Sequence, residues 1–356
     1  MIWTFLFIYI LFLSFVPFCI WEIHKNVIGN EQLLSIKDSN YIKGMAACGV
    51  FLAHCYFYIE NNSDLYITPL KFFSFLGGMG VLMFLFVGGF GLTKSCFETE
   101  EFDKTNYWIR RLRNVYIPAI CIETMFQSIL MITQEKTDFG SFFKSCFFGA
   151  WYIDVVMLEY LAFYLSMIIC KSAKRRVFFV FIFNILLFFI FSYLNLNSRW
   201  RNGLFLYPFG VWAAYNEKMI KGIVKKYYNF VLYNSIFCFC AVGAIFALNK
   251  GSLFSDLIKN MAGIFLAICF MTFFSRYEIK NRLMIELGKR SLFIYLVHLG
   301  VQSCLEIVKK YVSINICSYV FWWLLTTAIL TEFFYQFFER KIKKNRGAEK
   351  SNEKKD

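Results

Sequence analysis

Long apolar runs constrain this chain more than any other feature. Most runs hold 18 or more residues, and most charged residues lie in the short connections between runs. Wound as an α-helix, such a run crosses a hydrocarbon core about 30 Å thick. Only 17% of the 356 residues are charged and 58% are hydrophobic, whereas soluble domains carry about 25% charged residues. The sequence therefore predicts an all-α polytopic membrane helix bundle.

The apolar runs predict about eleven transmembrane helices. We expect them at 1–21, 41–59, 70–93, 115–133, 150–170, 177–194, 203–216, 229–248, 254–274, 288–309 and 317–338. The first run lacks a basic start and a small-residue cleavage site, so we expect a retained helix rather than a signal peptide. The chain then divides into an extra N-terminal helix with its connection (1–39), a membrane domain (40–339) and a basic cytoplasmic tail (340–356).

The basic residues are distributed unevenly between the two sides of this predicted bundle. The net charge is +14, from 38 Lys and Arg against 24 Asp and Glu. With the C-terminus in the cytoplasm, most of the 38 basic residues fall in cytoplasmic connections and the tail. The positive-inside rule then places the N-terminus outside a multi-pass protein of the cell membrane. The excess of basic residues is thereby explained by the orientation of the chain in the membrane, and we expect no nucleic-acid partner.

The twelve cysteines are scattered through the apolar runs without a CxxC pair or metal-ligand spacing. This pattern is typical of small buried hydrophobic residues rather than of disulfides, zinc sites or redox centres. We therefore expect no metal and no tightly bound cofactor.

Two ionisable residues lie in the second predicted span, Lys43 near its cytoplasmic end and His54 eleven residues later. On an α-helix this spacing brings them within about 20° of one face, with His54 about 16 Å above Lys43. Histidine exchanges a proton near neutral pH, so His54 could act as the base that activates a hydroxyl group. A hydrogen-bonded structural histidine is the alternative, and the spacing alone favours neither.

Three further groups of residues are candidates. His298 lies near mid-depth of a predicted span, and a buried histidine bonded to Tyr or Ser is its simpler explanation. Arg110 and Arg113 crowd the cytoplasmic border, where they could grip one phosphate group or only set topology. Arg199 and Arg201 flank Trp200 in a predicted outer loop, an arrangement that suits an anionic glycan or an interfacial tryptophan.

Five segments, in order, resemble the motifs of the membrane-bound acyltransferase-3 family. They are Lys43-x10-His54, GVLMFLFVGGF at 80–90, Arg110-x-x-Arg113, Trp151-Tyr152 with Glu159 and Tyr160, and LGKRSLFIYLVH at 287–298. Two positions depart from the pattern, since Lys43 replaces an arginine and Gly88 replaces a serine. The ten-helix family core would leave the first span as an addition.

The resemblance implies an acyltransferase, of the class that transfers groups other than amino-acyl groups, and an O-acetyltransferase in particular. It would move an acyl group from cytoplasmic acyl-CoA, usually acetyl-CoA, to a hydroxyl of an outer polysaccharide such as a capsule or exopolysaccharide. Arg110 and Arg113 would hold the CoA phosphates, Lys43 would position the donor, and His54 would take the hydroxyl proton. The residues that could bind or orient substrate are His298, Glu123, Asp154, Glu159, Trp151 and Arg199.

Two other classes of function stay open. A transporter or flippase would use buried His and Glu residues to relay protons or bind a substrate, although the sequence lacks the inverted repeats and paired broken helices of many transporters. A catalytically silent scaffold would fit the departures at Lys43 and Gly88.

The charge distribution predicts a testable topology. Reporter fusions placed after residues 22–40 and at the C-terminus should both report a cytoplasmic location, because the basic connections flank both points. An external signal from either fusion would contradict the predicted orientation.

Overall fold

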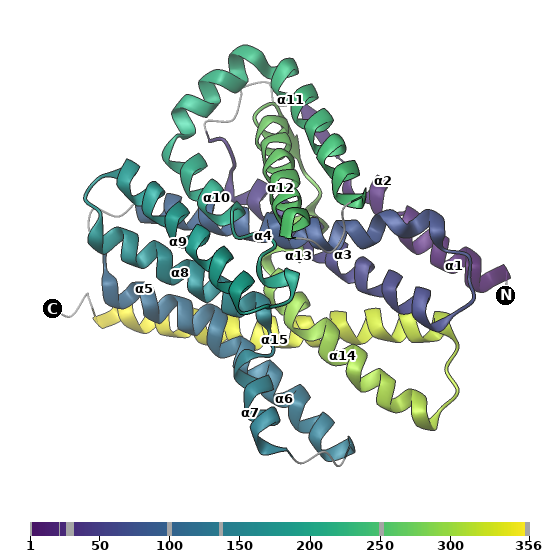
Figure 1. Ribbon diagram of the computed structural model, residues 1–356. Helices are drawn as coiled ribbons and strands as arrows, with labels where there is room; N and C mark the ends of the chain where they lie inside the picture. Colours follow the sequence, from purple (N-terminus) through teal and green to yellow (C-terminus); the bar gives the residue numbers. More distant parts are fainter. Residues whose placement is uncertain are drawn as a thin grey trace. The chain divides into compact units, whose positions relative to one another are not determined.

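The computed structural model describes residues 2–20, 22–25, 32–97, 102–134, 138–248 and 253–352 (Figure 1). Met1 and residue 21 of the predicted first span, residues 26–31 of the connection after it, and residues 353–356 of the predicted tail lie outside the described residues.

The described chain is built almost entirely of helices. They are α1 (Ile2–Leu13), α2 (Phe15–Cys19), α3 (Ile36–Asn62), η1 (Thr68–Lys71), α4 (Phe72–Phe97), α5 (Lys104–Arg111), the π-helical turn η2 (Leu112–Tyr116), α6 (Ile117–Gln134), α7 (Phe139–Phe148), α8 (Trp151–Ile169), α9 (Ala173–Tyr193), η3 (Ser198–Trp200), α10 (Leu206–Tyr215), α11 (Glu217–Leu248), α12 (Leu253–Phe274), α13 (Arg282–Lys289), α14 (Ser291–Tyr311) and α15 (Ile316–Asn352). Two short strands, β1 (Ile23–Lys25) and β2 (Tyr277–Ile279), pair in antiparallel fashion with His24 opposite Glu278.

The predicted fold class, an all-α polytopic membrane bundle, is confirmed. Nine helical segments of the described residues are long and apolar enough to cross a membrane. The runs predicted at 1–21 and 203–216 form shorter apolar helices, Leu6–Cys19 and α10. The ten residues of α10 extend only about 15 Å, half of a hydrocarbon core.

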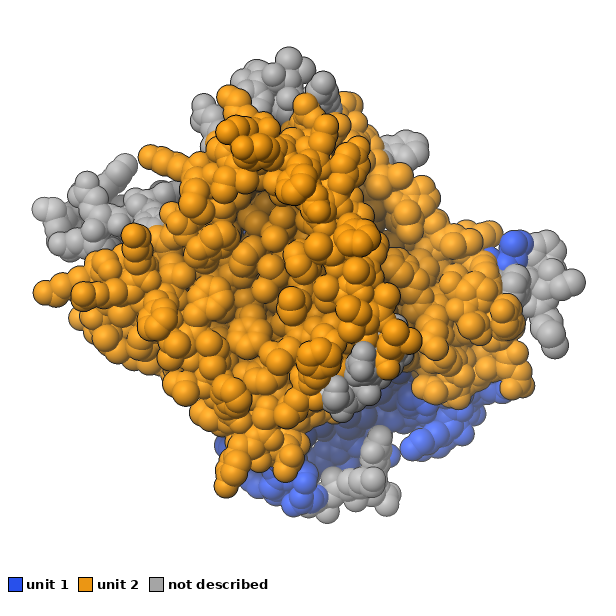
Figure 2. Space-filling model, turned by 45° about the horizontal axis from the view of Figure 1, so that its top comes forward, with its two compact units in different colours: residues 1–8, 108–153, 290–356 blue, residues 9–107, 154–289 orange. Residues whose placement is uncertain are grey.

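The helices form two compact units, coloured differently in Figure 2. The first unit contains residues 1–8, 108–153 and 290–356, and so most of α6, α7, α14 and α15. The second contains residues 9–107 and 154–289, and so α3, α4 and α9 to α13.

The core of the second unit is the contact between α3 and α4, where small residues let the two backbones approach. A Cβ atom added to Gly77 would collide with the Ala53 side chain, and one added to Gly80 would lie 2.7 Å from the carbonyl oxygen of Ala46. Small residues at such crossings are typical of membrane helices, because lipid-facing apolar surface gives no preference for one helix partner over another.

Two more close crossings hold α10 and α13 in the second unit. At the first, Gly89 of α4 faces the backbone of Tyr207, and Gly210 of α10 faces the backbone of Phe86. At the second, Gly288 of α13 faces the backbone of Asn40 in α3. Gly288 is the glycine of the 287–298 segment, so this part of the motif serves helix packing.

In the first unit, α14 packs on α6 and α15. The Phe126 ring of α6 lies against Gly300 of α14, where a Cβ atom would collide with it. The indole nitrogen of Trp323 in α15 donates a hydrogen bond to the His298 carbonyl oxygen at 2.7 Å. An ion pair of 2.6 Å joins Arg290 to Glu332. These contacts fix the helix that carries His298.

Neighbouring glycines of α4 give a matched test of this packing. Gly89→Ala should destabilise the fold by about 1–3 kcal/mol, because the new methyl group meets rigid backbone. Gly91→Ala should be neutral or slightly stabilising, and Gly88→Ser should be tolerated, because no heavy atom lies within 4 Å of either added Cβ. Thermal unfolding in detergent measures the difference, and equal midpoints for Gly89→Ala and Gly91→Ala would contradict the crossing.

Candidate functional site

Lys43 and His54 lie on one uninterrupted helix, α3. The helix begins at a capping box in which Ser35 and Asp38 satisfy each other's backbone N–H groups. Both Lys43 and His54 are partly exposed, while most of the helix around them is buried. The stripe between them consists of small or apolar side chains. The helix therefore presents one cationic and one imidazole side chain with limited solvent contact.

Arg199 acts on His54. The arginine is exposed in η3, whose first turn is capped by Asn197 accepting a hydrogen bond from the Arg199 N–H at 3.1 Å. Its positive charge interacts electrostatically with the His54 imidazole. The structure thus brings together two predicted site residues, the imidazole of α3 and a cation of the 196–205 segment.

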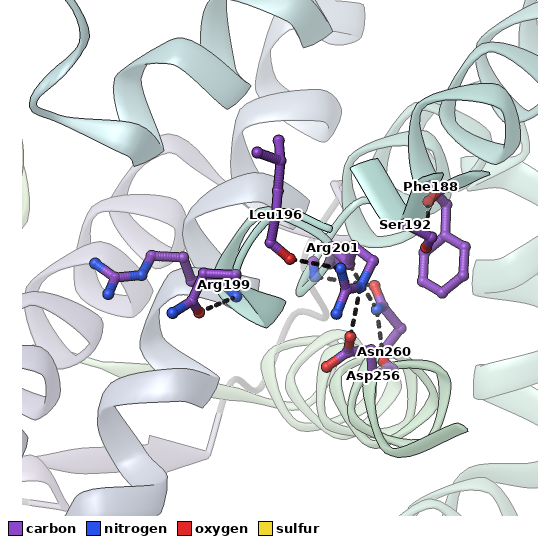
Figure 3. A network of polar contacts seen from close by, with 9 residues as sticks. Phe188, Ser192, Leu196, Arg199, Arg201, Asp256 and Asn260 are labelled. Atoms are coloured by element: carbon purple, nitrogen blue, oxygen red, sulfur yellow. Dashed lines mark hydrogen bonds and ion pairs between the residues drawn. The ribbon is translucent and has the colours of Figure 1, made fainter. Parts of the chain in front are cut away.

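Arg201 has a different role from Arg199: the Arg201 guanidinium lies against Asp256, whereas the Arg199 side chain extends away from this cluster (Figure 3). Arg201 donates to the Asp256 carboxylate at 2.7 Å and to the Leu196 carbonyl oxygen at 2.7 Å, and it is buried. Trp200 packs edge-on against Phe191 of α9, with ring centroids 5.6 Å apart. Arg201 is therefore held inside the unit, Trp200 is partly exposed against α9, and Arg199 is exposed.

Asn260 of α12 organises the backbone between η3 and α10. Its amide oxygen accepts from the N–H groups of Gly203 at 3.0 Å and Phe205 at 3.2 Å, and its amide nitrogen donates to the carbonyl oxygens of Arg201 at 3.1 Å and Asp256 at 2.8 Å. Gly203 has a positive φ of 97°, which favours glycine. One side chain thus replaces the hydrogen bonds that a helix would otherwise supply to this buried, irregular segment.

Lys259, next to Asn260, escaped the sequence-based list of site residues. Its ammonium interacts with Asp256, lies 5.8 Å from the Phe246 ring centroid, and approaches Gly78 of α4 so closely that an added Cβ would lie 2.9 Å from its Nζ. A signal was available in the sequence, because Asp256, Lys259 and Asn260 are three polar residues on neighbouring positions of an apolar span.

The carboxylates of α8 have separate environments. Trp151 is the first residue of the helix, Asp154 lies in its first turn and is partly exposed, and Glu159 is fully buried. Glu159 accepts a hydrogen bond of 2.9 Å from Asn184 of α9, whose amide also donates to the Val180 carbonyl oxygen. Glu159 therefore links α8 to α9, and its partner Asn184 was not identifiable from the sequence.

His298, in the first unit, is held through its backbone and one ring nitrogen. Nδ1 lies 3.0 Å and 2.8 Å from the carbonyl oxygens of Ile294 and Tyr295. Since a carbonyl oxygen only accepts, Nδ1 carries the proton, which leaves Nε2 with the lone pair of the neutral ring. The Tyr295 ring lies 5.9 Å from the His298 ring and 4.9 Å from that of Tyr152.

The remaining predicted site residues of the first unit are Glu123, Arg110 and Arg113. Glu123 lies on α6, one turn before Phe126, which contacts α14. Arg110 is exposed in the last turn of α5, and Arg113 lies in the π-helical turn η2 that follows without a break. Short π-helical turns inside α-helices are frequent at functional sites. The helical segment that contains the predicted span 115–133 begins earlier, at Lys104, so the arginine pair lies within it at this turn.

The described residues contain no group of three or more His, Cys, Asp or Glu side chains that could hold a metal ion. Their polar site residues instead combine imidazoles, cations and isolated carboxyl groups, a set suited to proton transfer and to binding anions.

Asn260 offers a direct test of how the segment that carries Arg199 is held. Asn260→Ala should lower the free energy of unfolding by about 1–3 kcal/mol, because it leaves buried N–H groups without acceptors. Asn234→Ala is the matched control, since Asn234 bonds only the Phe230 carbonyl of its own exposed helix. Equal losses in thermal unfolding of the two variants would show that Asn260 does not hold the segment.

Comparison with known proteins gives one match. A family model described as an acyltransferase domain, acyltransferase-3, matches residues 36–334. No curated protein and no solved structure matches the chain. The match covers most of the chain and includes all ten predicted site residues, from Lys43 to His298. The chain therefore belongs to the acyltransferase-3 family and is a multi-pass membrane acyltransferase.

Proposed function

We propose that the protein is a membrane O-acyltransferase of the cell membrane. It transfers an acyl group, in the first instance acetyl, from cytoplasmic acyl-CoA to a hydroxyl of a polysaccharide or lipid-linked glycan on the outer side. The match of residues 36–334 to an acyltransferase domain carries the proposal. The partly exposed imidazole of His54 beside Arg199 supports it, because acyl transfer to a hydroxyl needs a base next to a site for a polar acceptor.

On the cytoplasmic side, we assign Arg110 and Arg113 to the phosphates of the donor and Lys43 to positioning its acyl group. Guanidinium groups bind phosphate through paired, charge-assisted hydrogen bonds, so the two arginines suit the phosphates of CoA. Lys43 lies three turns below His54 on α3, and its charge would guide the donor toward the imidazole.

His54 acts as the general base in this proposal. The imidazole takes the proton of the acceptor hydroxyl while the hydroxyl oxygen attacks the thioester carbonyl carbon. The resulting tetrahedral intermediate collapses with cleavage of the C–S bond, and the imidazolium gives its proton to the sulfur of the departing CoA. The products are the glycan ester and free CoA, and His54 returns to its neutral form.

In this proposal, the other predicted site residues hold helices together or orient the substrates. Glu159, through Asn184, holds α8 against α9, and Trp151 and Asp154 lie at the predicted outer end of α8. His298 presents the lone pair of Nε2 from α14, and Glu123 lies on the helix that packs against α14. We assign these residues to orienting the substrates.

The donor site predicts a binding defect. Replacing both Arg110 and Arg113 by Ala should weaken acetyl-CoA binding at least about tenfold, as expected when charge-assisted hydrogen bonds are lost. The control replaces Lys174 and Arg175 by Ala, which removes two exposed charges from the predicted cytoplasmic end of α9. Isothermal titration of the purified variants measures both affinities, and an unchanged affinity in the Arg110/Arg113 variant would return these arginines to a role in topology.

The base predicts a defect in transfer. His54→Gln should lower glycan acylation by about 10²–10⁴-fold with little loss of folded protein, because Gln keeps size and hydrogen bonding but accepts no proton. His24→Gln, in the exposed strand β1, is the control. Lys43→Arg should stay active and Lys43→Ala should not, while His298→Ala should be milder than His54→Gln. Near-normal transfer by His54→Gln would exclude His54 as the base.

A further inference from the structure

Arg199 and Lys259 approach one region of the second unit from different elements. Gly77 of α4 packs against Ala53, the residue before His54, and the next residue, Gly78, faces the ammonium of Lys259. Arg199 acts on His54 from η3. A short chain of contacts across α4 therefore links Lys259 to the helix turn that carries His54.

The contacts of these residues include more cations than carboxylates. Asp256 is the carboxylate that contacts Arg201, at 2.7 Å, and it also interacts with Lys259. The Arg201 guanidinium donates hydrogen bonds to Asp256 and to the Leu196 carbonyl oxygen inside the unit. One carboxylate thus serves two cations, and Arg199 adds a third positive charge on an exposed side chain.

The position of Lys259 argues against a simple interfacial lysine. A lysine near a helix end usually extends its ammonium along its own helix toward the lipid headgroups. The Lys259 ammonium instead lies over Gly78, where the missing side chain leaves room for it. A charge placed there is expensive unless an anion or water meets it, and Asp256, the carboxylate that interacts with Lys259, is already paired with Arg201.

We infer that Arg199 and Lys259 bind the negative charge of the acceptor, so that the protein acylates an acidic glycan whose carboxylate or phosphate lies close to the hydroxyl that His54 deprotonates. This inference rests on the proposed function and on its orientation, which places the 196–205 segment and the start of α12 on the outer side. Hydrogen bonds of Arg201 to Asp256 and of Asn260 to the Arg201 backbone hold the segment that follows η3, the short helix that carries Arg199 (Figure 3).

The first experiment identifies the product. Surface glycans from cells with and without the gene are cut to oligosaccharides, separated by charge, and analysed by mass spectrometry. Gene-dependent acyl groups should be found on a sugar that bears a carboxylate or phosphate, or on its direct neighbour. Acyl groups confined to neutral repeats would overturn the inference and leave the proposed function standing, whereas no gene-dependent acyl group on any glycan would overturn both.

The second experiment uses variants in the same cells. Arg199→Gln and Lys259→Gln should each lower acylation of the acidic glycan at least about tenfold, as loss of a charge-assisted hydrogen bond predicts. Arg199→Lys and Lys259→Arg should restore much of it. Lys71→Gln, which removes an exposed charge at the predicted outer end of α4, should have no effect.

Gly78→Ala tests Lys259 without removing its charge. The added methyl group must displace the flexible end of Lys259, since it would lie 2.9 Å from Cε and Nζ. Acylation of the acidic glycan should fall in Gly78→Ala at unchanged amounts of membrane-inserted protein. Normal acylation in Gly78→Ala, Arg199→Gln and Lys259→Gln would overturn the inference even if the product is acidic.

Discussion

A backbone N–H or C=O group in a hydrocarbon core finds no water, so the chain itself must supply its hydrogen-bond partner. Helices meet this requirement locally, which is why nine long apolar helices dominate the described chain. The buried segment from Arg201 to Phe205 is not helical and obtains its partners from Asn260. Arg199 lies two residues before this segment, and its positive charge interacts with the His54 imidazole. The proposed site therefore lies at the place where the helical solution is interrupted.

The sequence predicted the fold class and the family because both can be recognised from the residues and their order along the chain, without knowledge of contacts between helices. Apolar length alone identified the spans, and five ordered motifs indicated acyltransferase-3, which the family match confirms. The sequence indicated a short span at 203–216, and α10 lies within it. Its glycine crossings with α4 and the bonds of Asn260 to the preceding segment join different spans and could not be predicted. The strand pair of β1 and β2 joins segments far apart in sequence and was equally invisible.

Site geometry was harder to predict for a related reason. Lys43, His54 and Arg199 could be selected from the sequence by residue type. The interaction between Arg199 and His54 could not, because it joins η3 to α3, two segments far apart in the sequence. Lys259 could have been selected, since an ionisable residue in an apolar span is a functional candidate by its cost alone. Glu159 was selected, yet its bond to Asn184 of the next helix depends on how α8 and α9 pack.

The central claim is that acyl transfer connects opposite sides of the membrane. Proteoliposomes loaded with radiolabelled acetyl-CoA and supplied with surface glycan on the outside measure it directly. Protein molecules inserted with their cytoplasmic side inward meet donor and acceptor on the proposed sides, and molecules inserted the other way are inactive. The account predicts labelled glycan when donor and acceptor are on opposite sides, and none when both are outside intact vesicles. Equal labelling with both outside would contradict it.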